Sequence, residues 1–269
     1  MRTLGFIGVG NMGSAILRGA LSSGFLTTDH VVVNDKNQAA MEQLAREHSG
    51  ITFMNTDVEV AEASDIVLLA VKPYSMRETL ESIGPHLKDK AVISIAAGWT
   101  STQLELALSG SGATCLRVMP NTPAMVGEGM TALCASNTLS SEDMAFAKGL
   151  FESIGRVAVV PEHLFDGVVA ISGSSPAYVY MMIEAMADAG VREGLPRAQA
   201  YEMAAQSVLG SALMVLSSGL HPGALKDAVC SPGGTTIEAV AALEKTGFRA
   251  SVMDAMKACA DRSREMSRQ

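Results

Sequence analysis

The sequence lacks the features by which several classes of protein are recognised. Its 269 residues carry a formal net charge of −8 and contain no cluster of Lys or Arg, whereas nucleic acid calls for a basic face. The longest clean apolar run, at 66–71, is far shorter than the ~18 residues that span a bilayer. We therefore expect neither nucleic acid nor a membrane as a partner.

Cysteine and histidine also lack the spacing that metal sites and disulfide frameworks show. The four Cys form no Cys-x-x-Cys pair and the five His are scattered, so we expect reduced thiols and no metal site. No signal peptide is expected, because a glycine motif occupies the place of its apolar segment. These absences favour a cytoplasmic protein that binds a small molecule and holds any anionic ligand with backbone N–H groups and a few side chains.

Short β-rich apolar runs alternate with helical patterns up to about residue 160. This alternation predicts an α/β fold with a doubly wound parallel sheet covered on both faces, whose last two or three strands join as a mixed edge. The expected strands lie at 3–7, 30–34, 51–53, 66–71, 91–95, 113–119, 130–134 and 156–160. A Rossmann-like, dinucleotide-binding domain at 1–160 follows from this pattern.

The strand signals stop after Pro161, and the sequence becomes rich in Ala and Met. Helical patterns at 176–193, 197–217, 224–229, 236–245 and 249–264 predict an all-helical domain at 161–269. The segment at 197–217 is apolar or small nearly all round, so it must be buried nearly all round. We expect two subunits to pack these helices in a symmetric homodimer, with an assembly of dimers left open. The alternative is a compact monomeric lobe with this helix at its centre.

A glycine motif near the N-terminus, G-V-G-N-M-G at 8–13, follows the first apolar run, opens a helical pattern and precedes an acidic residue 22 positions after its last glycine. Gly8 permits a tight turn, Gly10 lets the backbone approach a pyrophosphate, and Gly13 allows close packing of the helix. The N–H groups of Asn11 and Met12 face the negative charge. The motif therefore predicts a dinucleotide site.

Residues after three of the expected strands supply further cofactor contacts. Asp35 suits a ribose 2′-hydroxyl and so NAD, whereas Lys36 can pair with the 2′-phosphate of NADP, and the sequence leaves this choice open. Ala70-Val71-Lys72-Pro73 and Ala96-Ala97-Gly98 follow the fourth and fifth strands, where ligands of open α/β sheets lie. Small residues there leave room for a flat nicotinamide ring. A solvated loop lysine at 72 and plain close packing at 96–98 are alternatives of about equal weight.

A second glycine-rich segment, V-C-S-P-G-G-T-T at 229–236, leads directly into a helical pattern. Gly233 and Gly234 expose backbone N–H groups at the positive end of that helix, which is a ready site for a carboxylate or phosphate. The hydroxyls of Ser231, Thr235 and Thr236 add adaptable donors. From the residues alone, a plain capped loop is an alternative of equal weight.

With these segments in their order, the chain resembles the pyrroline-5-carboxylate reductases, the family of the last step of proline biosynthesis. The resemblance covers the whole chain and is carried by GFIGVGNMGSAI at 5–16, AVKP at 70–73, SIAAG at 94–98, RVMPNTPAMVGEG at 117–129, SGSSPAYVY at 172–180 and VCSPGGTTIEAVAALE at 229–244. It implies a Rossmann-like N-terminal domain, a helical C-terminal domain that interlocks with that of a second subunit, and usually NADPH as reductant, with NADH as the alternative. By matching motif, residues 8–13, Lys72 and 96–98 would line the cofactor, and 231–236 would hold the substrate.

On this resemblance we expect hydride transfer from nicotinamide C4 to the C=N carbon of 1-pyrroline-5-carboxylate, which gives L-proline. The N–H groups of 233–236 would bind the substrate carboxylate, and the hydroxyl of Thr236 would hydrogen-bond the imine nitrogen as the catalytic contact. No His or carboxylate is evident as a general acid, so the proton would arrive with the substrate or through water.

Two other functions fit parts of the sequence. Another two-domain NAD(P)-dependent reductase, such as a β-hydroxyacid dehydrogenase, shares the Rossmann start and a helical second domain. It usually needs a catalytic lysine in the first helix after the linker, and there is no Lys between Pro161 and Arg197. The other function is a non-catalytic sensor of the dinucleotide. Oxidation of NADPH that depends on added pyrroline-5-carboxylate would exclude the sensor.

Overall fold

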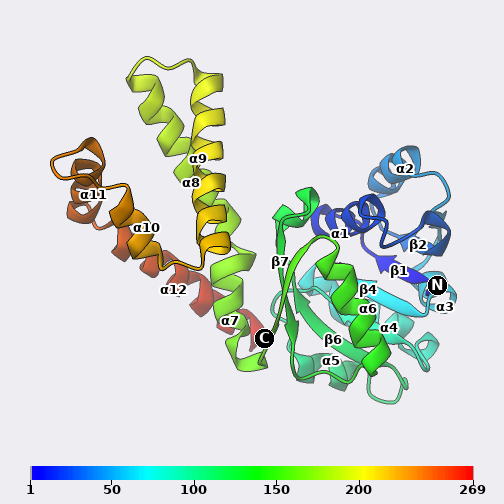
Figure 1. The fold of residues 1–269 in the computed structure, drawn as a ribbon. Coiled ribbons are helices and arrows are strands. Elements are labelled where there is room, and N and C mark those ends of the chain that lie inside the picture. The colour runs from blue at the N-terminus through cyan, green and yellow to red at the C-terminus, as the bar shows by residue number, and fades with distance from the viewer. Residues whose placement is uncertain (1, 269) are drawn as a thin grey trace. The chain divides into compact units, whose positions relative to one another are not determined.

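The computed structural model in Figure 1 describes residues 2–268, which form two compact units. The first unit runs to Ser174 and takes up the chain again from Cys259, and the second spans Ser175–Ala258. Helix α12 (Phe248–Ser267) therefore begins in the second unit and ends in the first. The expected domain limits at 160 and 161 follow the end of the strands rather than this division, and they stay a prediction.

The first unit is built on an eight-stranded sheet with the order β3-β2-β1-β4-β5-β6-β7-β8. All neighbouring strands are parallel except β6 and β7, which are antiparallel. The expected α/β, doubly wound sheet with a mixed edge is thereby confirmed. The strands are β1 (Leu4–Ile7), β2 (Val31–Asn34), β3 (Thr52–Phe53), β4 (Ile66–Leu69), β5 (Ala91–Ser94), β6 (Thr114–Met119), β7 (Gly129–Cys134) and β8 (Gly155–Val160).

Helices cover both faces of the sheet, and β1, β2, β4 and β5 are consequently buried at every residue. One apolar cluster, which includes Phe6, Leu68 and Phe151, joins the sheet to α1, α2 and α6. A second cluster, which includes Val67 and Leu104, joins it to α3, α4 and α5. These helices are α1 (Asn11–Ser22), α2 (Gln38–Glu47), α3 (Asp57–Ala63), α4 (Met76–Ile83), α5 (Ser101–Ala107) and α6 (Ser141–Glu152).

The chain after β8 forms short helical segments that the sequence pattern did not predict. A 3₁₀ turn at Glu162–Leu164 leads into α7 (Phe165–Val168), and a π-helical stretch, Val169–Gly173, follows. Glycine and β-branched residues give this segment a low helix propensity. Tertiary packing outweighs that preference, because Phe165 is buried in the first apolar cluster of the sheet.

The second unit is all-helical, as expected. Its helices are α8 (Ser175–Arg192), α9 (Arg197–Ser218), α10 (Pro222–Ala228), α11 (Thr235–Lys245) and the first part of α12. Helices α8 and α9 lie side by side (Figure 1). Ala200 and Ala204 are the only buried residues of α9, whereas Met203, Met214 and Leu216 are more than half exposed. Helix α9 is therefore not the centre of a compact lobe, and an apolar surface of this kind is typical of an interaction site.

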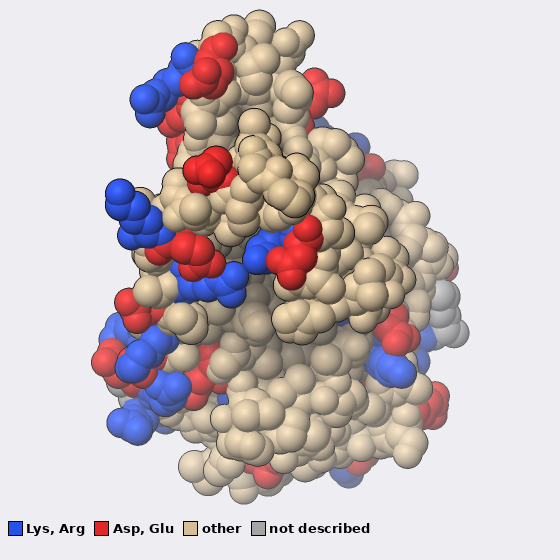
Figure 2. Space-filling model, turned by 60° about the vertical axis from the view of Figure 1, so that its left-hand side comes forward, with Lys and Arg blue, Asp and Glu red and all other residues tan. Residues whose placement is uncertain are grey.

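Charges of both signs occur on the face of the chain drawn in Figure 2. Figure 2 shows Lys and Arg side chains close to Asp and Glu on the face in view, without a broad area of one sign. No helix of residues 2–268 is long and apolar enough to cross a membrane. The same residues contain no group of three or more His, Cys, Asp or Glu side chains placed to hold a metal ion.

One ion pair between a buried arginine and a partly buried glutamate joins the sheet to the segment after β8. Arg117 of β6 is 3% exposed, and its Nη1 donates to Oε1 of Glu162. The guanidinium also lies 4.4 Å from the centre of the Phe165 ring, a cation–π contact that stabilises a charge held away from water. Ser101 Oγ and Cys134 Sγ donate to the same carboxylate, at 2.6 and 2.8 Å from Oε2. The carboxylate thereby joins the 3₁₀ turn that carries it to three other elements, β6, α5 and β7.

This carboxylate makes the stability of the fold depend on pH at the acid end. Burial raises the pKa of Glu162, but hydrogen bonds from Cys134 and Ser101 and the charge of Arg117 outweigh burial and leave the pKa below its ordinary value. A carboxyl with a lowered pKa stabilises the fold fully above its unfolded value of about 4.3, and this contribution is lost as the pH falls through the folded value. Glu162→Gln should therefore lower the Tm at neutral pH, and its Tm difference from wild type should shrink below about pH 4.

The measurement is thermal unfolding of wild type and variant over the acid range at one protein concentration. Glu105→Gln is the matched control, because it removes an exposed carboxylate from α5. Its Tm should stay close to that of wild type throughout. A Tm difference for Glu162→Gln that stayed constant down to about pH 3 would contradict the role given to this carboxylate.

Candidate active site

The glycine motif forms the turn between β1 and α1, and each glycine is required for a different reason. Gly8 has a φ of +95°, and a Cβ on it would lie 2.8 Å from the carbonyl oxygen of Ala70. A Cβ on Gly13 would lie 2.3 Å from the carbonyl oxygen of Gly8. A Cβ on Gly10 would meet no atom within 4 Å. Gly8 and Gly13 are therefore needed by the chain itself, whereas Gly10 leaves an open space in front of the helix.

The N-terminus of α1 faces that space without a side-chain cap. Gly10 is the N-cap residue, no side chain caps the helix, and its first turn contains no acidic residue. The N–H groups of Asn11 and Met12 begin the helix and carry its positive end. A pyrophosphate can take these donors, as the glycine motif predicted.

Asp35 is held by the chain in a way that the sequence did not predict. Its Oδ2 accepts from the backbone N–H of Val9 at 2.6 Å, and its Oδ1 accepts from that of Asn37 at 2.7 Å. The carboxylate thus ties the glycine turn to the start of α2. Lys36 next to it extends into solvent, with a side chain 74% exposed and its Nζ 3.5 Å from the equally exposed Glu78. An exposed pair of this kind contributes little, so the ammonium can exchange Glu78 for another anion.

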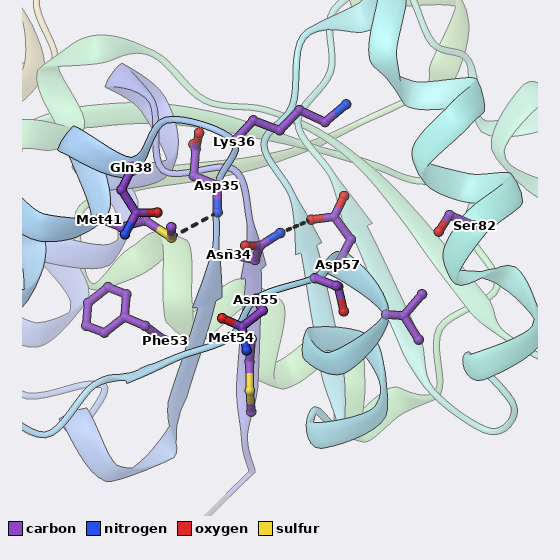
Figure 3. A pocket seen from close by; sticks show the side chains of 12 residues that line it. Asn34, Asp35, Lys36, Gln38, Met41, Phe53, Met54, Asn55, Asp57 and Ser82 are labelled. Atoms are coloured by element: carbon purple, nitrogen blue, oxygen red, sulfur yellow. Dashed lines mark hydrogen bonds between the residues drawn. The ribbon is translucent and has the colours of Figure 1, made fainter.

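A cavity of about 660 Å³ lies at the ends of β2 and β3 (Figure 3). Asn34 Nδ2 donates to Asp57 Oδ1 across it at 2.6 Å. The backbone N–H of Asn55 donates to Glu59 at 2.8 Å, which fixes the start of α3 below the cavity. The lining residues are Asn34, Asp35, Lys36, Gln38, Met41, Phe53, Met54, Asn55, Thr56, Asp57, Val58 and Ser82.

Sequence reasoning found only Asp35 and Lys36 of this lining. The signal that could have found the rest is positional, because ligands in such sheets lie beyond the carboxyl ends of the strands. The polar run Asn55-Thr56-Asp57 follows the short strand β3. Phe53 and Met41 have no such signal, since apolar residues in a strand and a helix read as ordinary core.

The loops after β4 and β5 come to the same edge of the sheet as the glycine turn. Ala70 donates its N–H to Ile7 at 2.9 Å, and its Cβ would lie 3.1 Å from a Cβ on Gly13. The indole N–H of Trp99 donates to the carbonyl of Pro73 at 3.1 Å, which joins the two loops. Ala96 is buried, Gly98 has a φ of +80°, and Lys72 is exposed. Pro73, Ala97 and Gly98 also line a second cavity of about 700 Å³ beside α4 and α5.

The second glycine-rich segment forms a turn before α11. The N–H of Gly234 donates to the carbonyl of Ser231 at 3.0 Å, and Gly233 has a φ of +65°. Gly234 is the N-cap residue of α11, and no side chain caps this helix. Ser231 and Thr235 are exposed, and Thr236 is half-buried. The structure thus brings Ser231 and residues 233–236 together at a helix N-terminus without a side-chain cap, which suits an anion. The first turn of this helix, unlike that of α1, contains an acidic residue, Glu238.

Comparisons with known proteins show the family of the chain. The family described as "Pyrroline-5-carboxylate reductase dimerisation" matches residues 162–266, and the family described as "NADP oxidoreductase coenzyme F420-dependent" matches residues 3–98. The chain is 49% identical to the pyrroline-5-carboxylate reductase of Escherichia coli strain K12 over 99% of both chains. It is 43% identical to that of Pisum sativum, over 98% of this chain and 96% of the relative.

Solved structures give the same result. A Plasmodium falciparum pyrroline carboxylate reductase with NADP bound has a TM-score of 0.89 and 35% identity, and covers 99% of this chain and 98% of its own. A Coxiella burnetii pyrroline-5-carboxylate reductase has a TM-score of 0.89 and 31% identity, with the same coverage. A Myxococcus stipitatus imine reductase, at 21% identity and a TM-score of 0.56, shares the fold. The chain belongs to the pyrroline-5-carboxylate reductase family.

Proposed function

We propose that this chain reduces 1-pyrroline-5-carboxylate to L-proline by hydride transfer from NADPH, the last step of proline biosynthesis. The observation that carries the proposal is the pair of uncapped helix N-termini behind glycine turns, at α1 and α11, in a chain that matches reductases of this name along its whole length. Each of these helix starts provides N–H donors for one anion, a pyrophosphate in one case and a carboxylate in the other.

The residues present fit a dinucleotide. The open space at Gly10, the bare start of α1 and the cavity at β2 and β3 would take the pyrophosphate and the adenosine end. The residues that would hold the cofactor are Gly8, Gly10, Asn11, Met12, Gly13, Asp35, Lys36, Ala70, Val71, Lys72, Pro73, Ala96, Ala97 and Gly98. NADPH is the favoured reductant, because the Plasmodium falciparum relative holds NADP and the matching family is named for it. NADH is the alternative.

Asp35 and Lys36 have different roles next to the ribose of the cofactor. The carboxylate of Asp35 already accepts two backbone N–H groups, so we assign it to holding the glycine turn. The exposed ammonium of Lys36 is the group that reaches a 2′-phosphate. Lys36 would exchange its contact with Glu78 for one with this phosphate.

The chemistry needs positioning and polarisation from the protein. Bound NADPH supplies the hydride for the C=N carbon. The N–H groups of Gly233, Thr235 and Thr236 bind the substrate carboxylate and fix one face of the pyrroline ring. Ser231 and Gly234 lie beside them, and the bond from the Gly234 N–H to the Ser231 carbonyl holds the turn in shape. The hydroxyl oxygen of Thr236 accepts a hydrogen bond from the protonated imine nitrogen and so favours that form, which accepts hydride far better. The proton arrives with the substrate or through water.

The chain contains a domain of the dimerisation type, and we place the dimer interface on the exposed apolar side chains of α8, α9 and α12. Met181, Met214 and Met253 are each more than half exposed in the single chain. A symmetric homodimer would bury them, and dimers could assemble further.

We retain 1–160 and 161–269 as the domain limits. The four cysteines are free thiols, which supports a cytoplasmic place for the enzyme.

The decisive test of the function is an assay of the purified chain with NADPH and 1-pyrroline-5-carboxylate. The loss of NADPH absorbance should depend on the added substrate. The amount of NADPH oxidised should equal the amount of L-proline formed. Binding of NADPH without turnover would support a sensor instead. Turnover with a 3-hydroxy acid and oxidised cofactor, in place of the pyrroline, would support a dehydrogenase.

Two alanine substitutions in the glycine motif should separate binding from folding. Gly10→Ala should leave the Tm unchanged, because its methyl group meets no protein atom, yet raise the KM for NADPH about tenfold or more by filling the pyrophosphate space. Gly13→Ala should lower the Tm as well, because its Cβ collides with the Gly8 carbonyl. Equal effects of the two variants on Tm would argue against these assignments.

Lys36→Ala should reduce kcat/KM with NADPH by about tenfold to a hundredfold, because a charge-assisted contact to the 2′-phosphate is worth ~1.5–3 kcal/mol. The same variant should leave kcat/KM with NADH nearly unchanged, since NADH lacks that phosphate. Lys88→Ala, which removes an exposed lysine after α4, is the control. Equal losses with the two cofactors would remove Lys36 from cofactor selection.

Thr236→Ala should lower kcat/KM for the pyrroline by ~1–3 kcal/mol, the contribution of one hydrogen bond in a closed site. Thr236→Ser keeps the hydroxyl and should recover most of that loss, while the oligomer stays intact in both variants. An unchanged value for Thr236→Ala would remove this hydroxyl from the mechanism.

A further inference from the structure

The carboxylate of Glu162 reaches back across the chain to the loop that follows β5. Its Oε2 accepts from Ser101 Oγ at 2.6 Å, and its Oε1 accepts from the backbone N–H of Ser101 at 3.2 Å. Ser101 is the first residue of α5. This helix already has a complete capping box between Thr100 and Gln103. The contact with Glu162 is therefore an additional anchor, supplied from outside the helix.

The loop at 95–100 is held at its other points by backbone and ring contacts. Ile95 donates its N–H to Leu69 of β4 at 3.1 Å, and Trp99 donates its indole N–H to Pro73 at 3.1 Å. Ser94, from which the loop departs, lies in register with Arg117. Because Arg117 pairs with Glu162, this ion pair secures the loop at both ends, through the neighbouring strand and through Ser101.

We propose that Glu162 is a positioning residue for NADPH, which acts through Ser101 to hold residues 96–98 in the conformation that receives the cofactor. The inference rests on the proposed cofactor role of Ala96, Ala97 and Gly98. Glu162 itself makes no contact with the cofactor in this role. Its four donors, two from Ser101 and one each from Cys134 and Arg117, keep its carboxylate in place.

Two of these donors offer a matched pair of variants. Ser101→Ala removes a hydroxyl that bonds Oε2 from the loop side, and Cys134→Ala removes a thiol that bonds the same oxygen from β7. The Ser101 hydroxyl also lies 3.3 Å from the Cys134 sulfur, and in Cys134→Ala it keeps its shorter bond to Glu162. Both residues are buried, and both variants leave the Arg117–Glu162 pair intact. A role that was only structural would make the two variants alike. A positioning role affects NADPH in Ser101→Ala alone.

The expected result for Ser101→Ala is a rise of about fivefold to tenfold in the KM for NADPH, which corresponds to one lost hydrogen bond. The loop then populates other conformations, and binding has to select the competent one. The kcat and the KM for the pyrroline should change by less than about twofold, since the substrate turn is untouched. Ser101→Thr should restore the KM, and Cys134→Ala should leave it at the wild-type value.

Trp99 provides a readout of the loop that does not require turnover. It is the only tryptophan of the chain and lies inside the loop. Quenching of its emission by acrylamide should increase in Ser101→Ala and stay at the wild-type level in Cys134→Ala. Energy transfer from Trp99 to added NADPH gives the Kd for each variant. A wild-type chain that bound NADPH without reducing the pyrroline would refute the proposed function. The inference on Glu162 would still be tested in that case, because the Kd for NADPH can be compared between the variants without turnover.

An unchanged Kd for NADPH in Ser101→Ala would overturn the inference, and so would an equal rise in Cys134→Ala. Glu162→Asp provides the second variant if Ser101→Ala does not fold. It keeps the charge opposite Arg117 and shortens the reach toward Ser101, so it should raise the Kd for NADPH as well. An Asp variant that folds, has lost no NADPH affinity and shows wild-type quenching of Trp99 would equally overturn it.

Discussion

The close approach of the glycine turn to itself and to β4 is the constraint on which the cofactor site depends. Gly13 lies against the Gly8 carbonyl, and Gly8 lies against the Ala70 carbonyl, so neither position leaves space for a side chain. This packing brings the start of α1 over the carboxyl ends of β1 and β4. The helix N–H groups are then directed at the open space in front of Gly10. Backbone geometry, rather than basic side chains, thereby creates the anion site in a chain of net charge −8.

Backbone hydrogen bonds also explain how an acidic side chain, that of Asp35, can lie so close to a proposed phosphate site. Its two oxygens accept N–H groups from Val9 and Asn37, so its charge is offset by backbone dipoles of the turn it holds. The carboxylate of Asp35 is thus occupied by contacts within the protein. The neighbouring Lys36 stays exposed at the edge of the cavity and free to bind a phosphate. An acidic residue at this position therefore does not by itself decide between the two dinucleotides.

Local patterns predicted the fold well, because the strands that are buried on both faces read as continuous apolar runs. Every expected strand occurs, and the mixed edge arises where β6 and β7 are antiparallel. The helical stretch at 165–173 was missed, since its order comes from Phe165 packing on the sheet and not from propensity. The glycine turns were found because they are contiguous. The lining of the β2 and β3 cavity was mostly missed, because its residues come from separate segments that only the folded sheet brings together.

Contacts between distant residues account for the rest of what the sequence did not predict. Glu162 follows the last strand and has no motif around it, yet it meets Ser101 across 61 positions and Arg117 across 45. From the sequence alone, an Arg within an apolar strand is not expected to be buried unless its charged partner is known. Removing one member of such a pair would leave an uncompensated charge, which is strongly destabilising. The pair is therefore best understood as a unit whose location, beside the strand that leads into the cofactor loop, links the stability of the fold to the geometry of the site.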